Sequence, residues 1–211
     1  WYNLAKRIGD ILLSLIALII LSPLLLLTAL LIKIEDRGPV FFRQKRCTKN
    51  GKVFEILKFR SMIVDAEKGG ETIPCRTGDP RITHVGRVIR KLRIDEFPQI
   101  INVLKGDMSS VGPRPERVEH VEAYTKEIPE FSYRLRVKGG LTGYAQIYGK
   151  YNTSPYDKLR LDLQYIEKQS LLMDLKLILL TVKIMFVPES TEGFTQKRSE
   201  QIAEEAKTKE Q

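Results

Sequence analysis

Two adjacent carboxylates, Asp95 and Glu96, are the side chains of this sequence best suited to chemistry. They are followed by Phe97 and Pro98, and a proline is typical of the first turn of a helix. The positive end of that helix and its free N–H groups would offset the repulsion between the two charges, so both carboxylates can stay ionised. Ionised carboxylates bind Mg²⁺ or Mn²⁺, and a carboxylate can also attack phosphorus as a nucleophile. The alternative is an ordinary solvated helix start, where acidic residues are favoured in any case.

Basic residues gather around this acidic pair. A guanidinium binds phosphate oxygens through two hydrogen bonds, and phosphoryl transfer requires a carboxylate, a divalent metal ion and a cluster of cations. A charge cluster without a catalytic task stays open as the other interpretation. The sequence has no Gly-rich Walker loop, and His84 and His120 are expected at the surface or in the core rather than in a catalytic triad. The basic residues are Lys58, Arg60, Arg87, Arg90, Lys91 and Arg93, together with Arg114 between Pro113 and Pro115.

The composition narrows the class of protein. The chain has 211 residues, 43% of them hydrophobic, and carries 35 Lys and Arg against 26 Asp and Glu, a net charge of +9. This hydrophobic content excludes a disordered chain, and the positive charge favours an anionic partner such as phosphate groups, nucleic acid or an acidic membrane surface. Two cysteines, Cys47 and Cys75, are too few for a disulfide framework or a cysteine metal site, which favours a reducing compartment.

An uncharged apolar segment runs from residue 11 to residue 32. As a helix it would be about 33 Å long, enough to cross a hydrocarbon core about 30 Å thick. It is too long for a signal peptide, and basic residues stand on both sides of it, so charge gives no orientation. Ser22 and Pro23 at its midpoint predict a bend, because proline removes a backbone donor and a serine hydroxyl can bind the carbonyl that is freed. Both a re-entrant segment and an ordinary spanning helix fit this pattern.

The rest of the chain predicts a small antiparallel hairpin followed by helices, hence a mainly helical α+β fold. Strands are expected at 40–44 and 53–59, because β-forming residues flank an Asn50-Gly51 pair that is typical of hairpins. Helices are expected at 81–93, from about 98 to 105, at 115–127, from 155 through 166, and at 171–187, the last either in the core or at a membrane interface.

Two other segments lack a strong helical or strand pattern. Residues 65–79 are polar and rich in glycine, and are expected to form a mobile loop. Residues 138–146 contain three glycines, which would allow a backbone to approach a ligand closely.

In their order along the chain, these pieces resemble the bacterial sugar transferases, monotopic phosphoglycosyl transferases that act on a polyprenyl phosphate. The resemblance covers about residue 6 to residue 194, and so many blocks in one order are specific. The chain departs from the usual family pattern at Thr48, Ser61 and Gly139, and Gly139 in place of proline is expected to loosen its loop. The blocks are Lys6-Arg7 with Asp10, Ser22-Pro23, Gly38 to Arg46, Lys58 to Met62, Asp95 to Gln99, Asn102 to Ser109, Val111 to Pro115, and Leu141 to Gln146.

The resemblance implies a reaction and a role for individual residues. Asp95 would attack the sugar-bearing phosphate of a UDP-sugar, expel UMP and hold the phosphosugar covalently. Polyprenyl phosphate, of the undecaprenyl type, would then take the phosphosugar in a ping-pong course. Glu96 would hold Mg²⁺, with Mn²⁺ as the substitute. The residues that would bind phosphate are Lys58, Arg60, Arg90 and Arg114, and Gln146 would shape the nucleotide or sugar pocket.

The resemblance also implies how the chain is organised and where it works. Residues 1–37 would form a re-entrant membrane helix broken at Ser22-Pro23, residues 38–188 a cytosolic catalytic domain with interfacial helices, and residues 189–211 a charged C-terminal tail. The active site would lie at the cytoplasmic face of the bacterial inner or plasma membrane, in contact with membrane lipids. The identity of the sugar and homo-oligomer formation are left open.

Two other functions stay open. A membrane-bound metal-dependent phosphohydrolase would use the same residues with water in place of the lipid acceptor. A non-catalytic basic protein tethered to a membrane would explain the charge and the apolar segment, but not an acidic pair among arginines. Nucleic acid is not expected as a partner, because exposed aromatic residues do not alternate with the basic ones.

Overall fold

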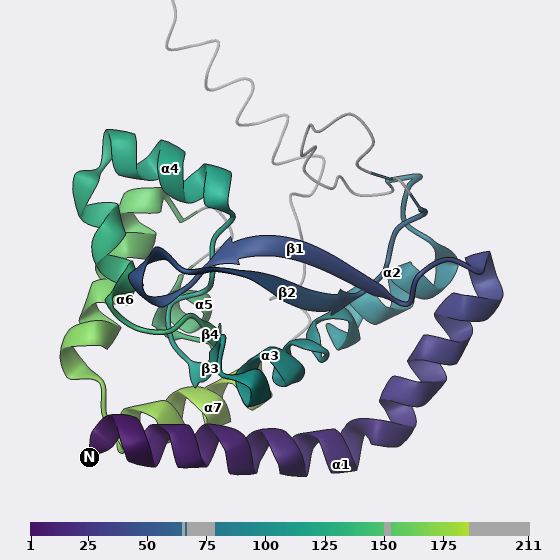
Figure 1. The fold of residues 1–211 in the computed structure, drawn as a ribbon, viewed down its shortest axis with the longest axis horizontal. Helices are drawn as coiled ribbons and strands as arrows, with labels where there is room; N and C mark the ends of the chain where they lie inside the picture. The colour runs from purple at the N-terminus through teal and green to yellow at the C-terminus, as the bar shows by residue number, and fades with distance from the viewer. Residues whose placement is uncertain (65, 67–78, 150–152, 186–211) are drawn as a thin grey trace, which may run out of the picture.

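In the computed structural model of this chain, a long apolar helix lies along the outside and a two-stranded hairpin crosses the middle (Figure 1). The structure describes residues 1–64, 66, 79–149 and 153–185, and within these ranges it is a mainly helical α+β fold, as the sequence predicts. The helices are α1 (Tyr2–Asp36), α2 (His84–Lys91), α3 (Gln99–Lys105), α4 (Val118–Glu127), α5 (Tyr144–Tyr148), α6 (Pro155–Lys168) and α7 (Leu171–Met185). The strands are β1 (Phe41–Cys47), β2 (Val53–Phe59), β3 (Ser109–Val111) and β4 (Gly140–Thr142), and the 3₁₀ turns are η1 (Lys49–Gly51), η2 (Ile94–Glu96) and η3 (Pro129–Arg136).

Helix α1 is continuous and contains Pro23. Proline cannot donate to the carbonyl of Ile19 four residues earlier, and the hydroxyl of Ser22 donates to that carbonyl instead, at 2.8 Å. Figure 1 shows that α1 changes direction partway along its length and lies along the outside of the other elements. The helix is therefore bent without being interrupted, because the serine keeps the freed carbonyl satisfied.

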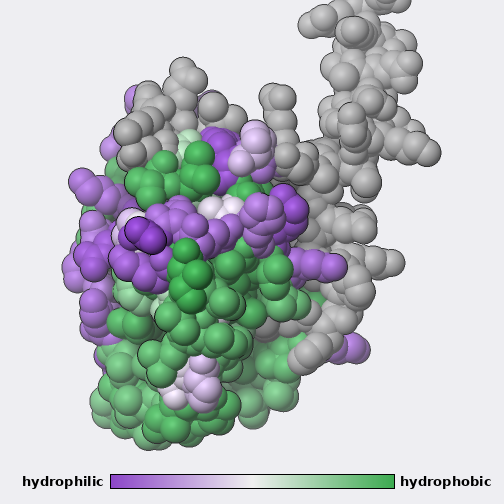
Figure 2. All heavy atoms as spheres, turned by 90° about the vertical axis from the view of Figure 1, so that its right-hand side faces the viewer, coloured by the Kyte–Doolittle hydropathy of each residue, from purple (hydrophilic) through white to green (hydrophobic). Residues whose placement is uncertain are grey.

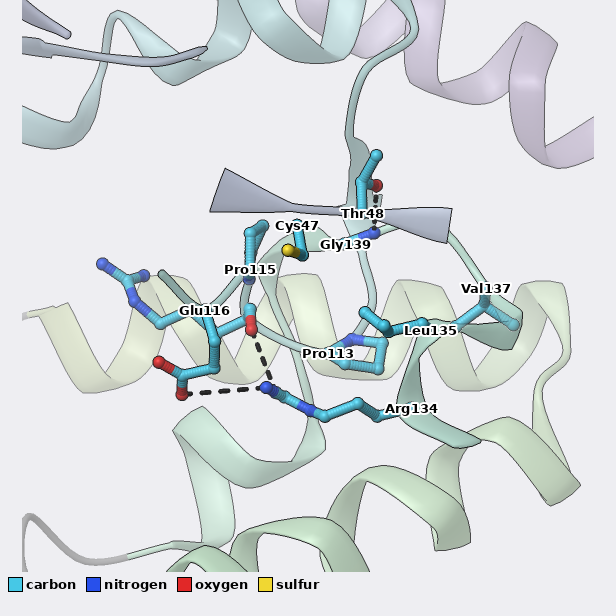
Figure 3. A pocket seen from close by; sticks show the side chains of 10 residues that line it. Cys47, Thr48, Pro113, Pro115, Glu116, Arg134, Leu135, Val137 and Gly139 are labelled. Atoms are coloured by element: carbon cyan, nitrogen blue, oxygen red, sulfur yellow. Dashed lines mark hydrogen bonds and ion pairs between the residues drawn. The ribbon is translucent and has the colours of Figure 1, made fainter. Parts of the chain in front are cut away.

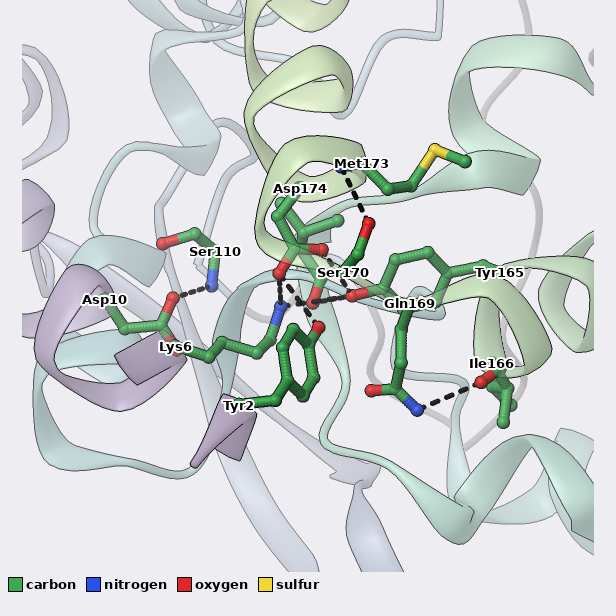
Figure 4. Close-up of polar contacts among 11 residues, drawn as sticks. Tyr2, Lys6, Asp10, Ser110, Tyr165, Ile166, Gln169, Ser170, Met173 and Asp174 are labelled. Atoms are coloured by element: carbon green, nitrogen blue, oxygen red, sulfur yellow. Dashed lines mark hydrogen bonds and ion pairs between the residues drawn. The ribbon is translucent and has the colours of Figure 1, made fainter. Parts of the chain in front are cut away.

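A polar network fastens the N-terminal end of α1 to the rest of the molecule (Figure 4). The ammonium of Lys6 donates to Asp174 on α7 at 2.6 Å and to the hydroxyl of Tyr165 on α6 at 3.0 Å. Asp10 is buried and accepts a hydrogen bond from the backbone N–H of Ser110 at 2.9 Å. Two charged residues at the start of α1 are thus held by groups more than 90 positions further along the chain.

The C-terminal end of α1 is fastened in the same way. The carboxylate of Glu35 accepts the backbone N–H groups of His84 and Val85, at 2.6 and 3.0 Å, and so caps the start of α2. Asp36 accepts hydrogen bonds from both terminal nitrogens of Arg60, at 2.7 and 2.5 Å. Both ends of the apolar helix are therefore bound to the same body of hairpin and helices.

The hairpin forms where the sequence predicts it. Strands β1 and β2 are antiparallel, with Phe41 opposite Phe59 and Cys47 opposite Val53. Asn50 has a φ of 59° and Gly51 a φ of 73°, a left-handed conformation that these residues and few others adopt readily. Strand β1 extends to Cys47, beyond the predicted end at residue 44.

The buried face of β2 joins the hairpin to α3. Phe54 and Ile56 pack against Val103 and Met108, all four of them nearly inaccessible to solvent. The side-chain amide of Asn102 pairs with a backbone N–H and a backbone carbonyl of β2, at 2.9 and 2.8 Å. Helix α3 is therefore fixed to β2 by apolar contacts and by a satisfied buried amide.

A short parallel strand pair, β3 and β4, was not predicted. Each of these strands has three residues, too few to show an alternating pattern. The glycines serve this pairing, because a Cβ on Gly140 would lie 2.1 Å from the backbone nitrogen of Gly112. Within the described residues, these glycines thus allow two segments of the chain itself to approach each other closely.

Two helix starts differ from the prediction. Helix α2 begins at residue 84 rather than 81, because the hydroxyl of Thr83 accepts the N–H of Gly86 at 2.9 Å and caps the helix there. Helix α4 begins at residue 118 rather than about 115. Most of the predicted loop at 65–79, and the whole predicted tail at 189–211, lie outside the described residues.

Candidate active site

The acidic pair lies in the turn η2, between α2 and α3. Arg93 just before η2 has a left-handed backbone with a φ of 55°, and Pro98 just after it is the N-cap of α3. At the other end of α3, the guanidinium of Arg7 donates to the carbonyls of Val103 and Leu104 at 2.7 and 2.8 Å. The apolar helix α1 therefore holds the short helix that follows the acidic pair.

Glu96 is bound by two cations. Lys58 on β2 donates to its Oε1 atom at 2.8 Å, and Arg114 donates to the same oxygen. The side chains of Glu96, Lys58 and Arg114 are 24%, 21% and 34% exposed, so they lie in a site that solvent and ligands can reach. Burial raises the pKa of Glu96, but the charges and hydrogen bonds of Arg114 and Lys58 outweigh it and hold the pKa far below its ordinary value.

Asp95 differs from its neighbour. In the part of the chain that the structure describes, its carboxylate makes no hydrogen bond or ion pair with another side chain. Burial raises the pKa of Asp95 above its ordinary value, the charge of Glu96 raises it further, and the charges of Lys58 and Arg90 only partly oppose this. One carboxylate of the pair is held ionised by cations, and the other is left available to react.

Arg60 and Gln146 do not share these contacts. Arg60 is 7% exposed, and both of its terminal nitrogens donate to Asp36 at the end of α1. Gln146 lies on α5 beside Gly143, where a Cβ would lie 2.6 Å from its Oε1 atom. Both amide atoms of Gln146 are buried without a partner among the described residues.

Two arginines that the sequence analysis gave no role support the segment that carries Arg114. Arg134 donates to the backbone carbonyl of Arg114 at 2.9 Å, and Arg46 donates to that of Pro115 at 3.2 Å. Arg46 stands in one of the sequence blocks named above, so its position was marked but its partner was not. Arg134 contacts residues 20 and 28 positions away, and no local spacing could have revealed it.

A small cavity lies behind this segment, between Pro113, Pro115, Arg134 and Gly139 (Figure 3). Its volume of about 10 Å³ leaves room for at most one water molecule. The cavity is therefore a gap in the packing, too small for a phosphorylated substrate.

The acidic pair fits a magnesium ion that a substrate helps to bind. Within the described ranges, no group of three or more His, Cys, Asp or Glu side chains comes together. Magnesium is usually held by one or two carboxylates, with water and substrate phosphates as the other ligands. Two adjacent carboxylates beside three cations match that donor set once a diphosphate is present.

A carboxylate without a side-chain partner in the described chain lies beside one held by cations, close to a long apolar helix, and this set of groups is compatible with phosphoryl transfer. The family described as bacterial sugar transferase matches residues 1–188, and this chain belongs to that family. The family assignment covers α1, the hairpin, the acidic pair and all later described elements.

Three relatives illustrate this membership. The chain is 46% identical over 185 residues to the UDP-N-acetylgalactosamine-undecaprenyl-phosphate N-acetylgalactosaminephosphotransferase of Aeromonas hydrophila, covering 86% of this chain and 44% of that protein. It is 42% identical over 193 residues to the UDP-glucose:undecaprenyl-phosphate glucose-1-phosphate transferase of Caulobacter vibrioides, covering 89% and 72%. It is 43% identical over 190 residues to the protein of the same name from Escherichia coli, covering 88% and 41%. The chain thus spans less than half the length of two of these three relatives.

Proposed function

We propose that this chain transfers a sugar-1-phosphate from a UDP-sugar to a polyprenyl phosphate of the undecaprenyl type and releases UMP. This would be the first membrane step in the assembly of a polysaccharide or glycoconjugate. The observation that carries the proposal is the contrast between Asp95, which has no side-chain partner in the described chain, and Glu96, which Lys58 and Arg114 hold ionised. The names of the relatives, which state UDP-sugar donors and an undecaprenyl phosphate acceptor, support it.

The proposed reaction has two displacement steps at one phosphorus atom. In the first, a carboxylate oxygen of Asp95 attacks the phosphorus that bears the sugar, the bond to the bridging oxygen breaks, and UMP leaves with that oxygen. In the second, an oxygen of polyprenyl phosphate attacks the same phosphorus, and the carboxylate of Asp95 leaves unchanged. Lys58, Arg90 and Arg114 would stabilise the negative charge on the phosphate oxygens in both steps.

Glu96 is the residue that would hold Mg²⁺, or Mn²⁺ in its place, together with the diphosphate of the donor. The ion would neutralise negative charge on that diphosphate and so favour the departure of UMP. Lys58 and Arg114 both bind Oε1 of Glu96, so they would fix the orientation of this carboxylate toward the ion.

The test is UMP release by the purified chain with Mg²⁺ and a panel of UDP-sugars that includes glucose and N-acetylgalactosamine donors. We expect sustained release only when undecaprenyl phosphate is added, loss of release with EDTA, and a phosphosugar on Asp95 in protein quenched without acceptor. Equal sustained release without the lipid would indicate a phosphohydrolase instead. No release with any donor would favour a basic membrane tether, and kinetics that require both substrates to bind together would contradict the covalent step.

We also propose that α1 enters and leaves the membrane on the cytoplasmic face. Its 35 residues would reach about 52 Å if straight, but both of its ends contact the same body of hairpin and helices. Figure 2 shows hydrophobic side chains over the lower part of the molecule, where α1 lies, and hydrophilic ones above. On α7, Leu172, Leu175 and Leu179 are 81%, 54% and 62% exposed and favour a membrane interface for this helix too.

The topology can be tested with cysteine labels. Asn3→Cys and Arg43→Cys place single labels on exposed residues before and after the apolar segment, in a chain whose native cysteines are replaced by serine. Glu119→Cys on α4 serves as the control for the catalytic side. We expect all three to react with an impermeant reagent from the same side of sealed vesicles. Labelling of the first two from opposite sides would reject the re-entrant arrangement.

A further inference from the structure

The backbone that carries Arg114 is held at four successive carbonyls. Because Pro113 and Pro115 have no N–H group, their carbonyls are the only backbone hydrogen-bonding groups that they offer. Each carbonyl from Pro113 to Glu116 accepts a hydrogen bond, and the donors come from β4, η3 and β1. These bonds are Gly140 N–H to Pro113, Arg134 Nη2 to Arg114, Arg46 Nη1 to Pro115 and Cys47 N–H to Glu116, at 2.9, 2.9, 3.2 and 3.0 Å.

Arg134 is bound in a way that keeps it from a substrate. It is 3% exposed, and its Nε and Nη2 atoms donate to the carboxylate of Asp162 on α6 at 2.9 and 2.7 Å. Its Nη1 atom lies 3.7 Å from the carboxylate of Glu116, and Figure 3 shows the side chain reaching Glu116 and the segment beside Pro113. Its charge is compensated within the protein, and its hydrogen bond to the carbonyl of Arg114 links it to the residue that binds Glu96.

Arg46 supports the next carbonyl from the hairpin. Its Nη2 atom donates to the side-chain oxygen of Gln44 at 2.6 Å, which fixes the plane of the guanidinium, and its Nη1 atom donates to Pro115. Burial lowers the pKa of Arg46 to about 10, so it is still charged at neutral pH and its hydrogen bond to the carbonyl is charge-assisted. Among the described residues, Arg46 forms no ion pair with a carboxylate that could explain its burial otherwise.

We propose that Arg134 and Arg46 are positioning residues, which hold the backbone of Arg114 so that its guanidinium meets both Glu96 and the diphosphate of the donor. This inference rests on the proposed function, because it assigns Arg114 to the donor's phosphates. A shift of about 1 Å in a group that binds the reacting phosphate can cost about a hundredfold in rate, so the two supports matter although they touch no substrate.

Donor binding tests this role separately from the chemistry. In an Asp95→Asn background, calorimetry would measure the Kd of a UDP-sugar that the unchanged chain accepts, for the parent, Arg46→Lys, Arg114→Lys and the double variant. We expect each single substitution to weaken binding about tenfold. We expect the double variant to bind no more weakly than Arg114→Lys alone, because Arg46 acts through Arg114. Arg43→Lys, an exposed arginine on the same strand, is the matched control and should bind like the parent.

Parent-like binding by Arg46→Lys or by Arg114→Lys would overturn the proposal, and so would losses that multiply in the double variant. Arg134→Lys is the second variant, because lysine keeps the charge beside Asp162 but lacks the planar group that also reaches Arg114. We expect a similar loss of binding with a thermal midpoint close to that of the parent. A loss that only follows a general drop in stability would make Arg134 purely structural. UMP release by the unchanged chain tests the proposed function independently of these variants.

Discussion

Two charged clusters contact the segment from Pro113 to Glu116, and they are built on opposite principles. The front cluster consists of Asp95, Glu96, Lys58 and Arg114. The side chains of its ion-paired residues, Glu96, Lys58 and Arg114, are 21–34% exposed. The carboxylate of Asp95 has no side-chain partner in the described chain. The rear cluster contains the pair of Arg134 and Asp162, whose side chains are 2% and 1% exposed. The chain keeps charge accessible where a ligand is expected, and buried and paired where a backbone has to be fixed.

The energetic consequences of the two clusters differ accordingly. A buried pair adds little net stability, but loss of one partner leaves an uncompensated charge and costs several kcal/mol. An accessible cluster can lose one member at a smaller cost in stability, because water solvates the group left behind. Substitutions in front should therefore change activity, and those behind that remove a buried charge should change the stability of the fold first. Each prediction below tests one side of this comparison.

The largest effect is expected for Asp95→Asn in the front cluster. The amide cannot act as the nucleophile, so UMP release should fall by about a thousandfold or more. Because Asp95 has no side-chain partner among the described residues, the free energy of unfolding should change by less than about 1 kcal/mol. Asp157→Asn, on the exposed start of α6, is the control and should keep full activity. An active Asp95→Asn enzyme would remove the basis of the proposed mechanism.

In the rear cluster, Asp162→Asn should act mainly on stability. It leaves the buried guanidinium of Arg134 without its nearest counter-charge, and we expect a loss of about 3 kcal/mol in the free energy of unfolding. Denaturant unfolding in detergent measures this, with Glu119→Gln on the exposed face of α4 as the control. If the loss is within the range of a surface substitution, the rear cluster does not hold the segment as described.

The front cluster was largely predictable, because its chemistry depends on residue types that stand out in a sequence. Asp95 and Glu96 are adjacent, and Lys58 and Arg114 are cations in blocks with hairpin or proline signals. The structure brings Lys58 and Arg114 to Glu96, and Arg90 close enough to affect the pKa of Asp95. The bend at Pro23 was predictable for the same reason, since proline has a local effect on the helix.

The rear cluster and the contact of Arg60 could not be predicted. Arg60 pairs with Asp36, and Arg134 pairs with Asp162, only because α1 and α6 return to the hairpin and the proline segment. The two members of such a pair are not related by a regular spacing in the sequence. A single arginine in a sequence also does not reveal whether its side chain faces a phosphate or a carboxylate. The strands β3 and β4 were missed because three residues show no alternation.

A smaller effect is expected on the pH dependence of the front cluster. Asp95 must be ionised to attack, so donor kcat/KM should fall as pH decreases through its raised pKa. Glu96→Gln removes a negative charge that raises this pKa, so the acidic limb should move to lower pH. Lys58→Gln removes a positive charge that lowers it, so the limb should move to higher pH. Both variants should also lose activity, by about a hundredfold.

The measurement is UMP release against pH at saturating acceptor. Lys45→Gln, an exposed lysine on β1, is the control for loss of a positive charge far from the acidic pair and should leave the limb in place. Glu96→Gln and Lys58→Gln test the role of Asp95 only if they shift the acidic limb of the pH profile in opposite directions. A shift of both limbs to the same side would show that the acidic limb does not report Asp95.

The smallest effect is expected for Gly139→Ala, whose new methyl group would crowd Pro115 in the segment from Pro113 to Glu116. The added Cβ would lie 2.5 Å from Cγ of Pro115, so the proline ring has to move, at a cost of about 1 kcal/mol in stability. If the rear of the segment positions the front, this movement should also reduce donor kcat/KM a few-fold, although Gly139 lies beside the small cavity and not in the cluster around the acidic pair. Gly9→Ala has no atom within 4 Å of the new Cβ and is the control, expected to keep both activity and stability. Lost stability with unchanged kcat/KM would mean that the two clusters share a backbone without being coupled through it.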